Sequence, residues 1–196
     1  FVVRSSHAHA RFRLGGVDKA RAVAGIVGIL THAETAGLRP LPVLQYVKNA
    51  ADGSDHWSPD YEVLPRDTVR HVGEAVAFIV AESLDAARSA AELIDVDYQP
   101  LPLVTDAVDA LAAGSPLVWP EQATNVVYDA AVGAAAATAA ALQGADRVVE
   151  LTLRNNRLIA NYMEPRSILA EHDLNTGSYR ATLGSQGVHG MQRGLA

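Results

Sequence analysis

The sequence predicts an α+β fold in two parts, an α/β unit followed by a β-rich segment. The first observation is an apolar, β-branched run at 74–81, followed by a helical pattern at 84–94 and an alternating run at 95–98. The second is a change of pattern near residue 146, after which apolar side chains tend to alternate with polar ones. The third is composition: 49% of the 196 residues are hydrophobic and 19% are charged, as in globular proteins.

Short elements are expected before this α/β unit. Residues 1–13 are predicted to be extended, 18–23 to form a helical turn that ends at Gly25, and 26–31 to form a buried strand. Residues 35–60 contain three prolines and an Asp-Gly-Ser turn signal, and their periodicity is poor. We therefore expect 35–60 to form a long surface loop.

The α/β unit is the best-defined part of the sequence. After the strand at 74–81, the Ser83 hydroxyl is expected to cap a helix. Its apolar positions fall at near-helical spacing, at Leu84, Ala87, Ala91 and Ile94. The alternating run at 95–98 predicts a half-buried strand. Whether the two strands are parallel neighbours stays open.

The second half begins with a connector and becomes β-patterned. A short helix is predicted at 106–112, and the Ala-rich stretch 130–142 is either a small amphipathic helix or a loosely held linker. A domain boundary is expected between Tyr98 and Asp146. The β-patterned part predicts strands at 146–153, 167–172 and 179–183, with a turn at 173–177.

Composition excludes several classes of function. Sixteen Lys and Arg against 22 Asp and Glu, with no basic block, disfavour nucleic-acid binding. Zero cysteines exclude disulfides, a Cys-ligated zinc site and an iron–sulfur cluster on this chain. No apolar run approaches the roughly 20 residues of a membrane span and no signal peptide is visible, so a cytoplasmic location is the default expectation. The start at Phe1 and the abrupt end at Ala196 suggest a piece of a longer protein.

Isolated motifs give little chemistry. His7 and His9 share one face of a predicted strand, which suits either a joint metal site or two solvent-facing or hydrogen-bonding histidines, with no third ligand placed by the sequence. Asp95 and Asp97 form a carboxylate pair that we interpret as a solvated strand face. No phosphate-binding glycine loop is found. Ser185 lacks the spacing of a nucleophile elbow, which leaves it a minor candidate nucleophile.

Polar residues gather between 155 and 189, within the β-patterned part. Buried polar groups need hydrogen-bond partners, so such a cluster is either a packed polar network or a ligand cradle. Both alternatives stay open from the residues alone. The members are Asn155, Asn156, Arg157, Asn161, Glu164, Arg166, Ser185, Gln186 and His189.

Several segments, in this order, resemble the molybdenum-cofactor-binding large subunit of the xanthine dehydrogenase, aldehyde oxidase and carbon monoxide dehydrogenase family. They read VRSSHAHAR at 3–11, GEAVA at 73–77, VDYQPLP at 96–102, NNR at 155–157, MEPR at 163–166 and SQGVH at 185–189. The resemblance implies an α/β hammerhead domain at 1–104 with a truncated start, then a connector with the Ala-rich helix at 105–144. It implies the truncated, β-rich beginning of a molybdopterin-binding domain at 145–196.

The resemblance also implies an activity for the full-length protein. A molybdenum ion held by molybdopterin would oxidise an aldehyde, an N-heteroaromatic compound or carbon monoxide, using oxygen derived from water. Electrons would pass to an iron–sulfur small subunit and an FAD medium subunit, in a dimer of heterotrimers. The Met-Glu-Pro-Arg motif is most similar to the carbon-monoxide-dehydrogenase-like branch, but it does not identify the substrate.

The resemblance implies that one residue of this chain contacts the cofactor. Gln186 matches the family glutamine whose side-chain amide approaches the molybdenum oxo ligand, and the alternative is a structural amide in a polar network. The resemblance places no catalytic residue and no metal ligand in this chain. Glu164 is not identified with the family's general base and is expected to shape the domain. This piece alone is expected to be inactive, and the competing hypothesis is a non-catalytic, hammerhead-like module that docks onto partner subunits.

Overall fold

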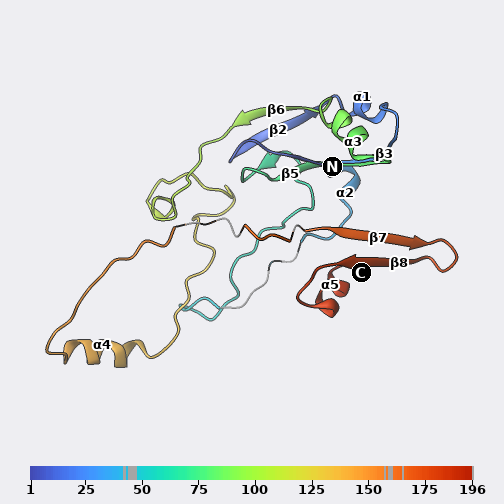
Figure 1. Ribbon diagram of the computed structural model, residues 1–196. Coiled ribbons are helices and arrows are strands. Elements are labelled where there is room, and N and C mark those ends of the chain that lie inside the picture. Colours follow the sequence, from blue (N-terminus) through green and yellow to red (C-terminus); the bar gives the residue numbers. More distant parts are fainter. Residues whose placement is uncertain (42, 44–47, 157, 159–160, 165, 196) are drawn as a thin grey trace. The chain divides into compact units, whose positions relative to one another are not determined.

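The computed structural model describes residues 1–41, 43, 48–156, 158, 161–164 and 166–195. The chain divides into two compact units, Phe1–Val132 and Gly133–Ala196, both visible in Figure 1. Helices and strands are mixed along the chain, which confirms the α+β class. The division between the units falls inside the expected connector at 105–144, while the three-segment division itself stays a prediction.

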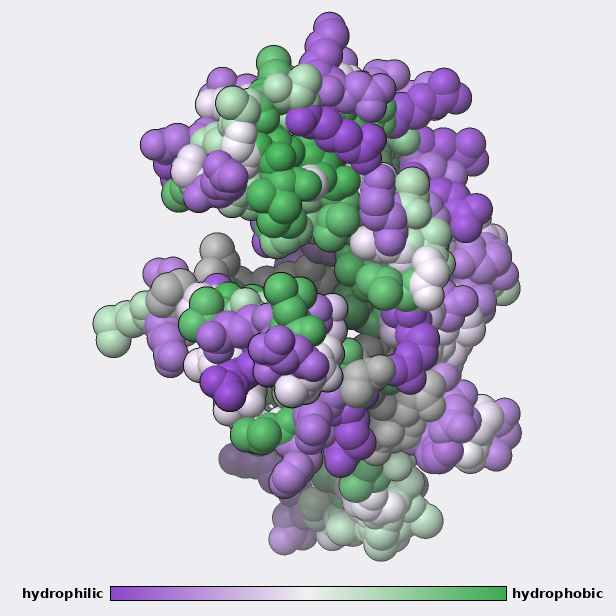
Figure 2. Space-filling model, turned by 90° about the vertical axis from the view of Figure 1, so that its right-hand side faces the viewer, coloured by the Kyte–Doolittle hydropathy of each residue, from purple (hydrophilic) through white to green (hydrophobic). Residues whose placement is uncertain are grey.

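The first unit contains a three-stranded antiparallel sheet in the order β1-β5-β3. The strands are β1 (Val2–Arg4), β5 (Ala75–Ala81) and β3 (Ile26–Leu30). The strand expected at 26–31 is confirmed, but its expected burial is wrong. β3 lies at the edge of the sheet, and its register with β5 shifts between Ile26 and Gly28. Val27 at this irregularity is 69% exposed, while Ile29 is buried. Figure 2 shows apolar and hydrophilic side chains side by side on the surface of this unit.

A second antiparallel sheet has the order β4-β2-β6. Its strands are β4 (Thr68–Val69), β2 (Ala10–Gly15) and β6 (Asp95–Pro100). The strands before and after the predicted helix, β5 and β6, therefore lie in different sheets and are not neighbours. Asp95 and Asp97 are exposed on β6, where Asp97 is opposite Arg13 of β2, which confirms the solvated-face interpretation.

Helices α1 (Val17–Arg21) and α3 (Leu84–Ala91) help enclose the larger of two hydrophobic cores. The Ser83 hydroxyl accepts a hydrogen bond from the Ala86 backbone at 3.2 Å, which confirms the expected cap. Of the four expected apolar positions, Ala87 and Ile94 are buried and Ala91 packs against the core, whereas Leu84 is 55% exposed, so the expected face is wrong at Leu84 alone. The buried members of this core are Ala20, Ile29, Ala77, Ile79, Ala87, Ala90 and Ile94.

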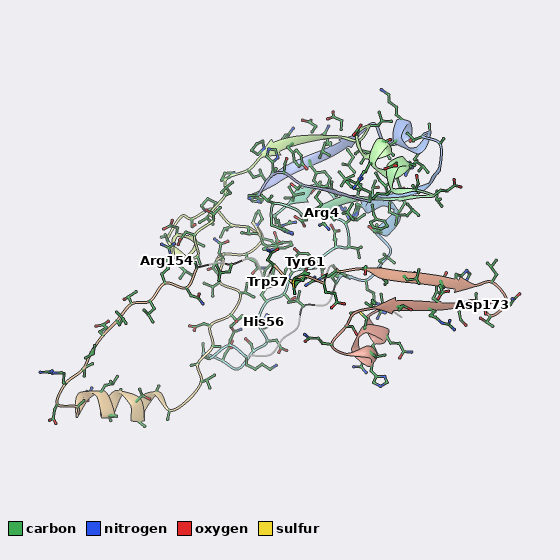
Figure 3. The ribbon with its side chains drawn as sticks, viewed as in Figure 1. Arg4, His56, Trp57, Tyr61, Arg154 and Asp173 are labelled. Carbon is green, nitrogen blue, oxygen red and sulfur yellow. The ribbon has the colours of Figure 1, made fainter. Side chains whose placement is uncertain are left out.

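Long loops are held to this unit by short contacts. Helix α2 (His32–Thr35) begins at a capping box formed by Thr31 and Glu34. Within the described part of 35–60, a helix end is followed by loop with isolated bridges, one of which pairs Lys48 with Asp55. The loop prediction is confirmed for these residues, and 42 and 44–47 lie outside the described part. Figure 3 labels His56 and Trp57 in this loop and Tyr61 directly after it.

The connector after β6 is anchored by Trp119. The Arg70 guanidinium lies 3.7 Å from the centroid of the Trp119 ring, a cation–π contact, and Trp57 meets the same ring edge-on at 5.7 Å. The expected helix at 106–112 is shorter than predicted and forms the 3-10 helix η1 (Asp109–Leu111).

The second unit contains helix α4 (Ala135–Gln143), a hairpin of β7 (Ile168–Asp173) and β8 (Ser178–Leu183), and helix α5 (Val188–Leu195). The two strands and the turn between them were expected. The Asn175 backbone donates to the Asp173 carboxylate at 2.9 Å, which lowers the pKa of Asp173 and fixes the start of the turn that Figure 3 labels.

Two expectations for the second unit need correction or completion. The predicted strand at 146–153 is wrong: these residues, all of them described, form no strand, and their apolar side chains, such as Val149 and Leu153, are exposed. Alternation alone does not make a strand, because the backbone also needs a pairing partner. Within the Ala-rich stretch, 135–143 forms helix α4, but none of its residues is buried, so the helix has no apolar face packed on a core. In the described part of the chain, no helix combines the length and apolar character needed to cross a membrane.

Replacing Ile79 tests the larger core. Ile79 is 1% exposed on the central strand of its sheet, so Ile79→Ala is expected to lower the free energy of unfolding by about 3 kcal/mol through lost burial and a cavity. Val27→Ala on the exposed edge strand is the control, with an expected change below about 0.5 kcal/mol. Denaturant unfolding measures both, and equal losses would contradict this core assignment.

The capping box of α2 predicts a pH dependence. The Thr31 hydroxyl and backbone both donate to the Glu34 carboxylate at 2.7 Å and lower its pKa from 4.5, with Arg21 assisting. Because the pKa of Glu34 is lower in the folded protein, the ionised carboxylate stabilises the fold at pH values above the ordinary pKa of 4.5. This contribution is lost as the pH falls through the pKa of the folded state. Thr31→Val is expected to cost about 1 kcal/mol at neutral pH. The free energy of unfolding should also fall less steeply with decreasing pH in the variant than in the parent. Denaturant unfolding at a series of acidic pH values measures this, and equal slopes for the two proteins would contradict it.

Candidate functional site

A cavity of about 860 Å³ in the second unit is the best candidate site. Three segments form it: the loop that precedes β7, the junction of β7 and β8 at their open end, and the turn from β8 into α5. Polar and apolar side chains both line it. The lining residues are Tyr162, Glu164, Arg166, Ser167, Ile168, Leu183, Gly184, Ser185, Gln186 and Met191.

The hairpin register explains why distant residues meet here. Ile168 at the start of β7 pairs with Leu183 at the end of β8, so the residues before β7 and after β8 are brought to the same end of the hairpin. The loop that carries Glu164 therefore lies beside the turn that carries Gln186. Glu164 and Gln186 are about twenty residues apart in sequence, and the antiparallel pairing of β7 with β8 brings them together.

Two side chains of the loop before β7 lie near each other. The Arg166 guanidinium lies 5.6 Å from the centroid of the Tyr162 ring, within the range of a cation–π interaction. Glu164 lies between them in sequence, and its Oε1 is 3.4 Å from the position that a Cβ on Gly184 would occupy. The carboxylate is thus close to the backbone just before Ser185 and Gln186.

Three of the polar lining side chains suit an oxygen-rich, anionic ligand, whereas the Glu164 carboxylate on the same cavity is an acceptor and opposes one. Gln186 supplies an amide that both donates and accepts, Ser185 a hydroxyl, and Arg166 a permanent positive charge with several N–H donors. An Arg guanidinium and positioned amide N–H groups are the usual partners of phosphate and oxo groups in proteins.

The structure brings together part of the polar cluster that the sequence singled out. Glu164, Arg166, Ser185 and Gln186 line the cavity. Asn155, Asn156, Asn161 and His189 are described but are not lining residues, and Arg157 lies outside the described residues. The four lining residues are exposed. Exposed polar groups facing an open cavity favour the ligand cradle over a packed, buried network.

The histidine pair near the N-terminus has structural contacts. The His7 ring stacks on Tyr98 at 4.3 Å, and His9, which is 8% exposed, hydrogen-bonds through Nδ1 to the Pro102 carbonyl at 2.8 Å. Of the two interpretations, these contacts favour hydrogen-bonding histidines. Within the described ranges, no group of three or more His, Cys, Asp or Glu residues is arranged to hold a metal ion.

Two family models match nearly the whole chain. The model described as the a/b hammerhead domain of aldehyde oxidase and xanthine dehydrogenase matches residues 1–102, and a molybdopterin cofactor-binding domain matches 118–196. The chain belongs to this molybdenum hydroxylase family. The fold and family expected from the sequence are therefore confirmed.

Curated relatives come from several branches of the family. The carbon monoxide dehydrogenase large chain of Afipia carboxidovorans is 38% identical over 116 residues, which are 59% of this chain and 13% of the relative. A probable xanthine dehydrogenase component from Bacillus subtilis is 28% identical over 191 residues, 97% of this chain and 23% of the relative. This chain thus spans less than a quarter of the length of either relative.

Solved structures of this family have a similar fold. Quinoline 2-oxidoreductase from Pseudomonas putida 86 matches with a TM-score of 0.78 and 29% identity, over 95% of this chain and 23% of that one. Carbon monoxide dehydrogenase from Oligotropha carboxidovorans matches with a TM-score of 0.77 and 25% identity, over 100% of this chain and 24% of that one.

Sequence reasoning missed some residues of the site. Gly184, Tyr162 and Met191 carry no charge and match no catalytic motif, yet all three line the cavity. The sequence contains a possible indication for two of these residues, Gly184 and Tyr162. A glycine comes directly before Ser185, and an aromatic residue lies four positions before Arg166.

The contacts of His7 and His9 predict that they hold no metal. In the full-length protein, replacing both histidines with Ala should leave the bound metal content unchanged, because His9 is engaged with Pro102 and His7 with Tyr98. Elemental analysis of purified parent and variant measures this. Loss of one metal equivalent per chain from a variant that stays folded would restore the metal-site interpretation.

Proposed function

We propose that this chain is part of the large subunit of a molybdenum hydroxylase and that Gln186 contacts its cofactor. The observation that carries the proposal is the position of Gln186 on a cavity of about 860 Å³, in a segment matched by the molybdopterin cofactor-binding model. The amide, hydroxyl and guanidinium groups that line this cavity fit an anionic, oxo-bearing cofactor.

The chemistry follows from the roles of cofactor and protein. When bound, the molybdenum centre would supply two-electron oxidation of a substrate carbon with oxygen derived from water. The Gln186 N–H would donate a hydrogen bond toward an oxo oxygen, and a positioned donor there stabilises charge that develops during the reaction. Arg166 would add positive charge on the same cavity.

The wider assignments concern the whole protein. The proposed substrate is an aldehyde, an N-heteroaromatic compound or carbon monoxide. The proposed electron acceptors are an iron–sulfur small subunit and an FAD medium subunit, in a dimer of heterotrimers. The chain covers less than a quarter of the length of these relatives, so its own residues do not identify substrate or partners. These proposals therefore rest on family membership.

Metal and substrate analysis of the full-length protein with its native partners tests the proposal. Molybdenum near one equivalent per large subunit, with oxidation of aldehyde, purine or carbon monoxide, is expected. A folded complex with its partners but without molybdenum would contradict the enzyme and favour the docking module.

Gln186→Ala tests the role of the glutamine. It should keep the molybdenum content while lowering kcat by about 10²-fold, as expected for loss of one positioned donor. Gln192→Ala is the matched control, since Gln192 lies on α5 and is not a lining residue. Equal kcat values for the two variants would contradict a cofactor contact by Gln186.

A further inference from the structure

We propose that a clasp within the first unit fixes the point from which the chain passes to the second unit. The clasp joins loop 48–57 to segment 116–132. The match to the hammerhead model ends at residue 102 and the match to the cofactor-binding model begins at 118, yet the first compact unit extends to Val132. Residues 118–132 therefore match a cofactor-binding domain in sequence while they fold with the first unit. This inference does not depend on the proposed activity.

The loop half of the clasp is organised by Asn49. Its Nδ2 donates to Ser54 Oγ at 3.0 Å and to the Asp55 carbonyl at 3.2 Å, and its backbone N–H donates to the Ser54 carbonyl at 3.0 Å. The Asn49 carbonyl accepts from the Gly53 N–H at 2.8 Å. Both donor hydrogens of the side-chain amide are thus used inside the loop, which leaves Oδ1 to accept from a partner outside it.

That partner is Asp129, which lies 80 residues further along the chain. The Asp129 N–H donates to Asn49 Oδ1 at 3.3 Å, and the Asp129 carbonyl accepts from the Ala50 N–H at 2.7 Å. Beside these bonds, the rings of His56 and Tyr128 lie 5.5 Å apart. Both backbone groups of Asp129 are therefore paired with two consecutive loop residues. Figure 1 shows the loop meeting the chain before α4 in this region.

Ring contacts form a second point of attachment, at Trp119. The Arg70 guanidinium lies 3.7 Å from the centroid of the Trp119 ring, and the Trp57 ring meets Trp119 edge-on at 5.7 Å. Arg70 is itself held, because its Nη1 donates to the carbonyl of Thr68 on β4 at 3.2 Å. Trp119 is thereby attached to the sheet β4-β2-β6 as well as to the loop.

The two points of attachment belong to a segment that Asn125 holds in shape. Its Oδ1 accepts from the Val118 N–H at 3.0 Å, and its Nδ2 donates to the carbonyls of Pro116 at 3.0 Å and Ala110 at 3.2 Å. The segment is thus a closed loop around this amide. Because the attachment at 129 lies directly before the end of the first unit, the chain enters the second unit from a fixed point.

Hydrogen exchange of the full-length large subunit in its native complex tests the clasp. Trp119→Ala should raise amide exchange about tenfold in 116–132 and also in 48–57, because each segment protects the other. Asn49→Ala should likewise raise exchange in 116–132, while exchange in β5 should match the parent. Val108→Ala is the control, since Val108 lies on the connector and is 75% exposed, and it should leave both segments unchanged.

Three results would overturn the clasp: exchange equal to that of the parent, a rise confined to the segment that carries the substitution, or an equal rise in β5. Trp119→Phe keeps an aromatic face for Arg70, so its exchange should lie between those of the parent and Trp119→Ala. If Trp119→Ala fails to fold, Asn49→Ala and Trp119→Phe still decide. In the parent itself, amides of Ala50 and Asp129 that exchange as fast as those of an unstructured peptide would contradict the two hydrogen bonds.

The clasp and the proposed function fail separately, because exchange is measured whether or not the complex contains molybdenum. A complex without molybdenum contradicts the proposed function. An exchange pattern without coupling between 48–57 and 116–132 contradicts only the clasp.

Discussion

The first unit depends on the burial of β5, the central strand of its sheet. Ala77 and Ile79 belong to the core beneath α1 and α3, while Val76 belongs to a second core with Ala10, Phe12 and Val69 of the other sheet. One strand therefore contributes to both hydrophobic cores. Because burial of apolar side chains is the main favourable term in folding, the two sheets and the helices are held together through β5. The longer loops are added to this body by contacts such as that between Arg70 and Trp119.

The second unit is built on a different principle. Its side chains are almost all exposed in the described part, and its order comes from the β7–β8 ladder and a fixed turn. A two-stranded hairpin is marginally stable by itself, so apolar side chains such as Tyr179 and Ile168 need further partners. The family membership is consistent with this, since the relatives are several times longer than this chain.

The candidate site follows from that ladder. Pairing of Ile168 with Leu183 places the Glu164 loop beside the Gln186 turn. Within the loop, the Arg166 guanidinium lies 5.6 Å from the centroid of the Tyr162 ring. A polar cavity thus forms at a place where strand pairing ends and backbone direction changes, which is where functional residues are commonly found.

The sequence by itself determined the α+β class, most helices and strands, the Ser83 cap, the family and the candidate Gln186. These depend on local periodicity, on capping chemistry and on motifs, which are all written in neighbouring residues. Only the tertiary structure decided that β5 and β6 lie in different sheets, that β3 is an edge strand and that 146–153 is not a strand. It also decided that Glu164 and Gln186 line the same cavity. Strand partners, side-chain exposure and contacts between distant residues depend on which surfaces meet, and alternation along one segment does not specify that.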